Sequence, residues 1–434
     1  MLFEEFPVEL IQSVLGFMDS RSLLSTMMTC KKLRSLGEPI LYSHVVFSYK
    51  LFKALGKRSH LFSLVRHFES PEELYGWEED FESVQDVEEV KQIVRIMAVD
   101  TKVDRNMDPI YFRGEDHNDA LFFFLTTKFP NLKSLQVNGD YYHSAYLVPF
   151  FANIAMKFPI ERRLCKLKRL ELASEPESDH RHNGPSPYIF HLPQLESLSF
   201  FSPLGVVRRW PEQCLRLDHL RELQMTNLRH DIESLRAVIT AAPNLLDLEA
   251  FIQPERGWMG EKPFDCTVLG DALRQCRRLR RLVIKAPKKY RIQSDEHEIR
   301  MQGSIGSLTS LSELQYLVIS LDAFLGCLKP PENLCFPATD YLPPNLHTLM
   351  FYVDMGTVDP GEWTPMDVYE TSVVCTRRER PPFPKLQHYG IEGYGQWAEK
   401  EEELVGSLCK LAGLSYDVDL PWHSLNHLVF GDED

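Results

Sequence analysis

A short phrase of alternating apolar and polar positions recurs along most of this chain. The phrase reads L-x-x-L-x-φ, where φ is an apolar residue, as in KLKRLEL at 166–172. The alternation in its second half predicts a short strand with one buried face. The first leucines of the ten copies are Leu132, Leu167, Leu195, Leu220, Leu245, Leu279, Leu314, Leu346, Leu386 and Leu425.

These copies are 25 to 40 residues apart, and several of them follow a helical pattern. Residues 118–128, 231–241 and 267–276 have apolar side chains near i, i+3 and i+4 before the pattern breaks. Each unit therefore predicts a helix, a breaker and a strand. Because such a unit cannot bury its apolar side alone, we expect the units to stack into a curved array with one continuous core.

The first 45 residues have another pattern, which predicts three short amphipathic helices. Apolar residues share one stripe at helical spacing between Leu10 and Met18, and further apolar groups lie at 23–27 and 30–36. A module of this size is too small to bury its own apolar face, so we expect that face to bind a partner. The alternative is that these residues cover the first unit of the repeat array.

Charge and cysteine usage narrow the compartment and the partners. The chain has 434 residues and a formal net charge of −14, which disfavours nucleic acid and anionic membrane as partners. Its nine scattered cysteines contain no C-x-x-C pair, its acidic start differs from a signal peptide, and it has no spanning segment or glycosylation sequon. We therefore expect a protein of the cytoplasm, the nucleus or both.

Sequence motifs that carry chemistry are missing. There is no G-x-x-x-x-G-K-[ST], H-E-x-x-H or G-x-S-x-G segment, and no cysteine spacing typical of a zinc site. We therefore expect a non-catalytic protein that uses neither a cofactor nor a metal.

The N-terminal segment resembles the F-box family. The resemblance lies in FPVELIQSVLGFM at 6–18, CKKLRSL at 30–36 and LY at 41–42, with Phe6 and Leu33 where leucine and tryptophan are usual. It implies an F-box at 1–46 that docks on a Skp adaptor and reaches a cullin through it. The positions that match Skp contacts are Pro7, Leu10, Ile11, Val14, Leu15, Met18 and Leu23.

The remainder, residues 47–434, is expected to form the repeat array. From about residue 60 to residue 434 it resembles the leucine-rich repeat family, with Ala250 and Tyr389 at expected leucines. The resemblance implies an α/β fold, an irregular solenoid with a parallel sheet on its concave face and helices on its convex face. Four segments fit the period poorly and are expected to be inserts, near 69–89, 173–190, 286–303 and 352–383.

In each strand phrase, the residues that flank the second leucine are expected to face the concave side. Large aromatics beside charges are typical of a protein-binding surface. The substrate-binding residues predicted there are Phe201, Phe251, Arg281, Lys285, Tyr316 and Tyr352. Two questions stay open: whether inserts cover these side chains, and whether the basic segment 277–291 binds an acidic or phosphorylated segment or is a solvated edge, which the sequence favours.

Together the two resemblances imply the substrate-recognition adaptor of a Skp-cullin-F-box ubiquitin ligase. The N-terminal module would dock on Skp, and the repeat array would hold a protein substrate. The first alternative is an F-box scaffold protein that works without a cullin. The second is an enzyme whose catalytic residues lie in the inserts.

Overall fold

The computed structural model of the chain forms two compact units, Met1–Ser202 and Pro203–Asp434, and each is described by itself. Of the helices that the structure describes, none is long and apolar enough to cross a membrane. The described residues are 6–71, 116–138, 147, 150–152, 154, 164–173, 187–204, 216–229, 232–253, 264–286, 289–292, 295–298, 301–326, 338–354, 371–373, 375, 383–394 and 399–417.

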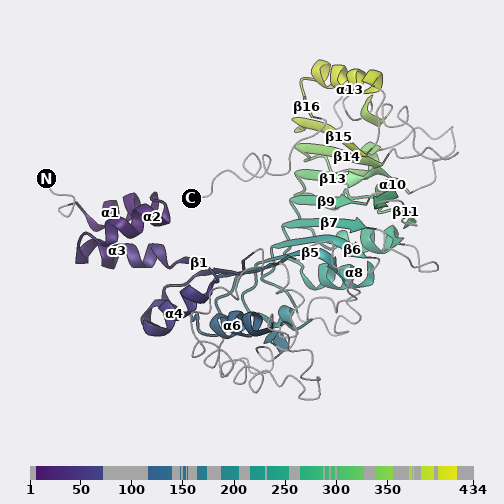
Figure 1. Cartoon of the computed structure of the whole chain (residues 1–434). Coiled ribbons are helices and arrows are strands. Elements are labelled where there is room, and N and C mark those ends of the chain that lie inside the picture. Colours follow the sequence, from purple (N-terminus) through teal and green to yellow (C-terminus); the bar gives the residue numbers. More distant parts are fainter. Residues whose placement is uncertain are drawn as a thin grey trace, which may run out of the picture. The chain divides into compact units, whose positions relative to one another are not determined.

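Three helices begin the first unit, α1 (Val8–Gly16), α2 (Ser20–Met27) and α3 (Lys31–Leu41) (Figure 1). Asp19 caps α2, because its Oδ1 accepts hydrogen bonds from the backbone N–H groups of Arg21 and Ser22, both at 3.0 Å. The predicted helical module is therefore present, and it buries part of its apolar surface in a small core of its own. That core consists of Ile11, Leu15, Leu23, Met27 and Leu33.

The strands of the first unit form a parallel sheet in the order β1-β2-β3-β4-β5. Phenylalanines fill its core: the ring of Phe68 stacks on Phe122 and meets Phe129 edge-on, with centroids 4.8 Å apart in both pairs. Its elements after α3 are β1 (His44–Val46), α4 (Tyr49–Lys57), η2 (Ser59–Ser63), β2 (His67–Glu69), α6 (Asp116–Thr126), β3 (Ser134–Val137), β4 (Arg169–Ala173), η6 (Pro187–His191) and β5 (Ser197–Leu204).

The second unit contains a parallel sheet in the order β6-β7-β9-β13-β14-β15-β16 (Figure 1). Its described elements are β6 (Glu222–Arg229), α8 (Ile232–Ala241), β7 (Asp247–Gln253), β8 (Phe264–Asp265), α9 (Cys266–Leu273), β9 (Arg281–Lys285), β10 (Lys289–Ile292), β11 (Asp295–Glu298), β12 (Met301–Gln302), β13 (Tyr316–Ser320), α10 (Leu321–Leu325), α11 (Ala338–Tyr341), β14 (Thr348–Asp354), β15 (His388–Tyr394), α13 (Glu399–Ala412) and β16 (Ser415–Asp417).

Leucines set the register of this sheet. Leu248 pairs with Leu282, Leu282 with Leu317, and Leu317 with Leu349, and all four are fully buried. Each is the second leucine of its phrase. Because the same position of successive phrases lies side by side, the buried leucines form a continuous row across the strands.

Nine of the ten predicted strand phrases are strands in the described part of the chain, namely β3 to β7, β9 and β13 to β15. The tenth, at Leu425, lies outside the described residues. The predicted helices at 118–128, 231–241 and 267–276 correspond to α6, α8 and α9. Among the strands of the parallel sheets described above, the phrase did not predict β1, β2 or β16.

The predicted segment boundaries are described only in part. Three of the four expected inserts, near 69–89, 173–190 and 352–383, lie mostly outside the described residues. The insert near 286–303 is described in larger part and holds β10 and β11, which pair antiparallel. The segment 1–46, predicted to be the N-terminal module, includes β1, whose backbone pairs with β2 from His44 to Val46. These three residues therefore belong to the sheet.

Candidate functional site

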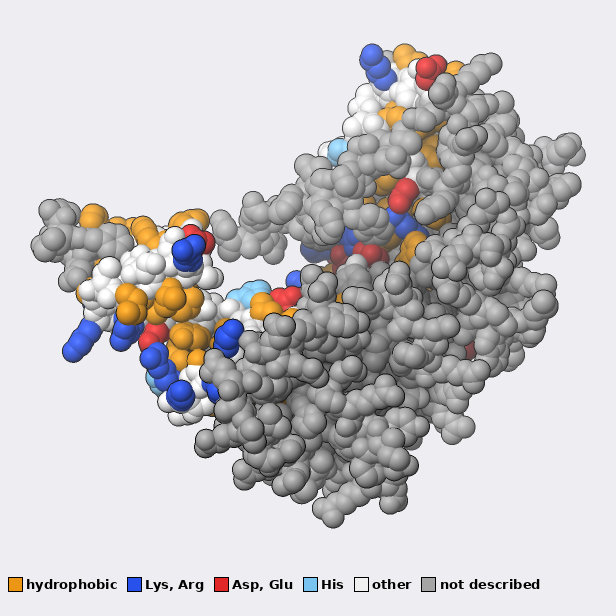
Figure 2. Space-filling view, in the orientation of Figure 1, with side chains coloured by type: hydrophobic (Ala, Val, Ile, Leu, Met, Phe, Trp, Pro, Cys, Tyr) orange, Lys and Arg blue, Asp and Glu red, His pale blue; other side chains and the backbone are white. Residues whose placement is uncertain are grey.

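One face of the second unit's sheet gathers charged and aromatic side chains. Successive side chains of a strand point to opposite faces, so the residues that flank the buried leucines share the other face. We call it the polar sheet face, and Figure 2 shows acidic, basic and hydrophobic side chains together in this unit. Its described residues include Glu222, Gln224, Asp247, Glu249, Phe251, Arg281, Val283, Lys285, Tyr316, Val318, Ser320, Thr348, Met350, Tyr352, His388 and Glu392.

Arg281 lies at the centre of the charged part of this face. Its Nη1 donates to Asp247 Oδ1 at 2.8 Å, and its Nη2 donates to Glu249 Oε2 at 3.1 Å. Glu249 also accepts a hydrogen bond from Gln224 Nε2 at 3.0 Å, and the guanidinium lies 5.4 Å from the ring centroid of Tyr316. A buried guanidinium thus joins β7, β9 and β13 through charge-assisted contacts.

A second ion pair spans the face from β9 to β15. Lys285 Nζ donates to Glu392 Oε1 at 2.5 Å and lies 5.8 Å from the ring centroid of Tyr352. Strands β13 and β14 lie between the two partners, so their backbones are three strand spacings, roughly 14 Å, apart. Such a contact needs a sheet that curves toward this face, since side chains standing straight out from a flat sheet would not meet.

The structure brings most of the predicted substrate residues together but shields them. Arg281, Lys285, Tyr316 and Tyr352 lie on the polar sheet face, and each is less than 10% exposed. Tyr316 packs in an apolar cluster with Val283, Val318 and Met350. This low exposure agrees with the alternative in which the face is not open to solvent at these positions.

The remaining two predicted residues differ from these four. Phe251 is half-buried on β7. Phe201 is in β5 of the first unit, and its side chain lies outside the described part of the structure. No comparison tests the substrate role of any of the six residues, so that role stays a prediction.

The carboxylates that hold Arg281 and Lys285 were not among the predicted site residues. A signal was present, since Asp247 and Arg281 occupy the same position of neighbouring phrases and pair in the sheet. Opposite charges at one position of successive strands indicate a cross-strand ion pair. Glu392 gave no comparable local signal, because it is 107 positions from Lys285.

Burial changes the titration of Asp247. Burial raises the pKa of its carboxyl to about 6, Arg281 opposes the rise, and the charges of Glu222 and Glu249 add to it. The ionised carboxylate is therefore held at a cost in folding free energy at neutral pH.

Lowering the pH from about 7.5 to about 5 is expected to raise the free energy of unfolding of the wild type, relative to that of an Asp247→Asn variant, by about 1 kcal/mol. Because the pKa of Asp247 in the folded chain, about 6, lies above its ordinary value of 3.8, the folded chain binds a proton in that interval that the unfolded chain does not. The loss of folding free energy that comes from ionised Asp247 is fully present above pH 7 and disappears as the pH falls through 6. Urea unfolding of both proteins at the two pH values measures the difference, and a difference that is constant with pH would contradict the assignment.

The N-terminal module offers a different kind of surface. Of the seven predicted contact residues, Ile11, Leu15 and Leu23 lie in the module's own core. Leu10, Val14 and Pro7 are exposed, and Met18 is half-buried. On a helix with about 3.6 residues per turn, Ile11 and Leu15 form one stripe and Leu10 and Val14 form the next. Packing against α2 and α3 therefore buries the first stripe and leaves the second exposed.

Further exposed apolar residues extend this surface beyond the predicted set. Phe17 is 90% exposed at the end of α1, and Leu24 and Met28 are exposed on or just after α2. Figure 2 shows hydrophobic side chains at the surface of the module. The spacing of Phe17, seven residues after Leu10, could have placed it on the same stripe. We call Leu10, Val14, Phe17, Leu24 and Met28 the exposed apolar residues of the module.

Residues 3–38 match the F-box domain family. The match covers α1, α2 and most of α3, and it agrees with the resemblance found in the sequence. None of the curated proteins that were compared matches this chain. The match therefore supports an F-box protein.

No group of three or more His, Cys, Asp or Glu residues that could hold a metal ion is found among the described residues. Burial raises the pKa of Cys276, Cys375 and Cys409 to about 12 each. These thiols are protonated at neutral pH and are poor nucleophiles.

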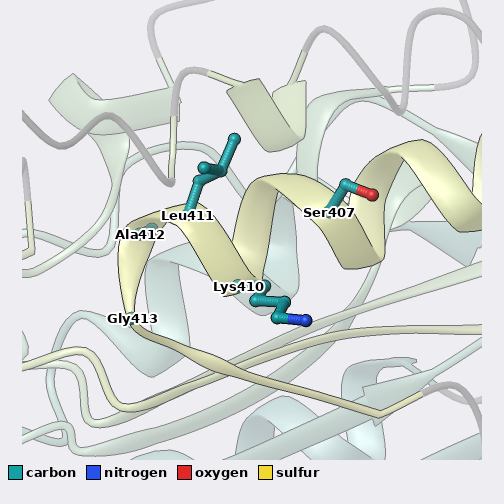
Figure 3. Close-up of a pocket in the computed structure, with 5 residues that line it drawn as sticks. All are labelled: Ser407, Lys410, Leu411, Ala412 and Gly413. Atoms are coloured by element: carbon teal, nitrogen blue, oxygen red, sulfur yellow. The ribbon is translucent and has the colours of Figure 1, made fainter.

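A shallow hollow of about 610 Å³ lies at the C-terminal end of α13. Its lining residues are Ser407, Lys410, Leu411, Ala412 and Gly413. Figure 3 shows the Lys410 and Leu411 side chains pointing in different directions from the helix. They do not converge on a common point, so this hollow lacks the geometry of a binding site for a small molecule.

Proposed function

We propose that this chain is the substrate-recognition subunit of a Skp-cullin-F-box ubiquitin ligase of the cytoplasm or nucleus. The F-box domain supports a role in ubiquitin-ligase substrate recognition generally, and F-box domains typically bind a Skp adaptor. The observation that carries the proposal is a matched F-box with its own core that still exposes Phe17 and neighbouring apolar side chains. Apolar side chains presented on a folded helical module are what a helix-binding groove receives.

In this proposal the sheet-containing part of the chain is a leucine-rich repeat array that holds a protein substrate. The support is the phrase L-x-x-L-x-φ, whose described copies become neighbouring parallel strands with the second leucine, or Tyr389 in β15, buried in register. The chain itself needs no reactive residue, because a substrate held near the transferring subunit reacts through proximity and orientation. The cullin would be reached through Skp.

A triple variant, Leu10→Ala/Val14→Ala/Phe17→Ala, is expected to lower capture of Skp from cell extract at least tenfold. Truncation of central apolar contacts in an interface costs about 2 kcal/mol or more, and each 1.4 kcal/mol is about tenfold in affinity. These three side chains are exposed, so the F-box should stay folded. Ile11 and Leu15 are left intact, because truncating core residues costs about 2–5 kcal/mol of stability and would confuse unfolding with lost binding.

A matched control is Leu404→Ala/Leu411→Ala, which removes exposed leucines from α13 and should leave Skp capture unchanged. Circular dichroism of both variants checks the fold. If the triple variant captures as much Skp as the wild type, docking through these residues is wrong. If the wild type retains Skp but no cullin, the cullin-independent scaffold is the better reading.

A further inference from the structure

Among the side chains that the structure describes on the polar sheet face, every accessible Asp, Glu, Lys or Arg is acidic. Glu222 is exposed, and the side chains of Asp247 and Glu392 are 21% and 26% exposed. The side chains of Arg281 and Lys285 are only 10% and 4% exposed. A partner that reaches this face therefore meets carboxylates.

The nearby cations offset these carboxylates only in part. Arg281 and Lys285, the cations of this face whose side chains the structure describes, are taken up by the ion pairs described above. Arg280, which immediately precedes β9, is also paired, because its Nε lies 3.6 Å from Glu313 Oε2. Arg221, which immediately precedes β6, keeps its positive charge, since its Nη1 donates to the neutral carbonyl oxygen of Asn244 at 3.1 Å. The three carboxylates of Glu222, Asp247 and Glu249 against Arg221 and Arg281 leave a net charge of −1 at the β6–β7 end.

The excess of negative charge is concentrated around Arg281. Asp247 and Glu249 contact this single guanidinium, and Glu222, which pairs with Asp247 across β6 and β7, adds a third carboxylate. Glu222 forms no ion pair with a described residue, and Asp247 contacts Arg281 through Oδ1 alone, which leaves its Oδ2 available. These oxygens can accept hydrogen bonds from a cation supplied by a partner.

An aromatic ring lies on the same strand as these acids. Phe251 is half-buried on β7, two residues after Glu249 and four after Asp247, so its ring is on the same face. An aromatic ring beside carboxylates suits a lysine or arginine, whose aliphatic stem packs on the ring while its charged end meets the acids. An acidic or phosphorylated segment would instead be repelled.

We propose that the β6–β7 end of the polar sheet face binds a basic segment of a partner protein, in which a lysine or arginine lies next to an apolar residue. The proposal rests on the proposed function, because it names the class of substrate that the receptor holds. It reverses the alternative suggested by the basic segment 277–291, since Arg281 and Lys285 are neutralised within the fold. Recognition then depends on Glu222 and Asp247.

The test uses the full-length chain and two labelled synthetic peptides, one of Gly-Ser-Lys-Leu repeats and one of Gly-Ser-Glu-Leu repeats. Fluorescence anisotropy is expected to show binding of the lysine peptide and little binding of the glutamate peptide. Glu222→Gln, which removes one exposed charge and keeps the size, is expected to weaken binding of the lysine peptide about threefold to tenfold. Glu222→Lys is expected to weaken it further and to improve binding of the glutamate peptide.

The control is Glu403→Gln, which removes one exposed carboxylate from α13. An equal loss of binding in Glu222→Gln and Glu403→Gln would show general attraction to an acidic chain and would overturn the proposal. Equal or tighter binding of the glutamate peptide by the wild type would overturn it as well. Skp capture by the same proteins separates the two proposals: a wild type that binds the lysine peptide through Glu222 but captures no Skp contradicts the ligase function and leaves the basic-segment site standing.

Discussion

Replacing Arg281 with methionine is expected to lower the free energy of unfolding of the second unit by about 3–5 kcal/mol. The guanidinium is buried and contacts Asp247 and Glu249, and Glu249 is buried as well. Methionine fills much of the same space but leaves two neighbouring carboxylates without a cation. Their repulsion and desolvation are then uncompensated. Urea unfolding of the full-length protein, followed by circular dichroism, measures the loss.

Two further variants show whether the loss comes from the stranded acids. Arg278→Met removes an exposed arginine three positions away, and it is expected to change stability by less than about 0.5 kcal/mol. Adding Asp247→Asn and Glu249→Gln to Arg281→Met is expected to recover a large part of the stability. If Arg281→Met costs no more than Arg278→Met, the ion-pair network does not stabilise this unit.

A methyl group at position 270 is expected to destabilise the second unit by about 3 kcal/mol, although Gly270 lies in helix α9. A Cβ there would lie 2.1 Å from the carbonyl oxygen of Ile305 and 2.8 Å from its carbonyl carbon. The carbonyl cannot move away easily, because Arg274 Nη1 donates to its oxygen at 3.0 Å and the N–H of Ile305 donates to Ala323 O at 2.9 Å. Thermal and urea unfolding of Gly270→Ala measure the loss.

Helix propensity alone predicts the opposite sign, since alanine stabilises a helix interior relative to glycine by roughly 0.5–1 kcal/mol. The matched control is Gly56→Ala in α4, where an added Cβ would meet nothing within 4 Å. That variant is expected to gain stability by up to about this amount. A gain for Gly270→Ala as well would mean that the segment around Ile305 does not pack against α9 as described.

The ion pairs also explain why the charge of the predicted substrate-binding surface differs from the charge that the sequence suggests. The basic segment 277–291 favours a solvated edge and leaves a surface for acidic ligands as the alternative, but two of its members, Arg281 and Lys285, donate to carboxylates of β7 and β15. Their positive charge is neutralised within the sheet, whereas Glu222, which forms no ion pair with a described residue, stays at the surface. The charge of a face thus depends on which side chains are left after the internal pairs have formed.

The strands that the phrase did not predict show where pattern reading stops. In β1 and β2, Val45 and Phe68 pair with each other in the row that continues to Leu135 of β3. In β16, Tyr416 stands at the same position and pairs with Tyr389. Backbone hydrogen bonds between strands do not require leucine, so a strand can join the sheet although its sequence departs from the phrase.

The F-box shows the same limit at the level of single side chains. Helical spacing places Leu10, Ile11, Val14 and Leu15 on one broad apolar stripe of α1. The sequence pattern does not show which of them are buried and which are exposed. Packing of α2 and α3 divides the stripe, which buries Ile11 and Leu15 and leaves the other two exposed. Which half faces inward depends on where the neighbouring helices lie, and spacing along one helix carries no such information.

The amino-acid sequence alone was sufficient to predict the N-terminal helices and nine of the described strands, which follow the repeated phrase. These elements depend on local periodicity and on breakers within a few residues. The partners of Arg281 and Lys285, the burial of Tyr316 and Tyr352, and the surplus of acid at Glu222 required the folded chain. Lys285 and Glu392 are 107 positions apart in the sequence, and they meet only because the sheet curves over the three strand spacings between them. Contacts of that kind depend on the summed geometry of the sheet, and no local pattern encodes them.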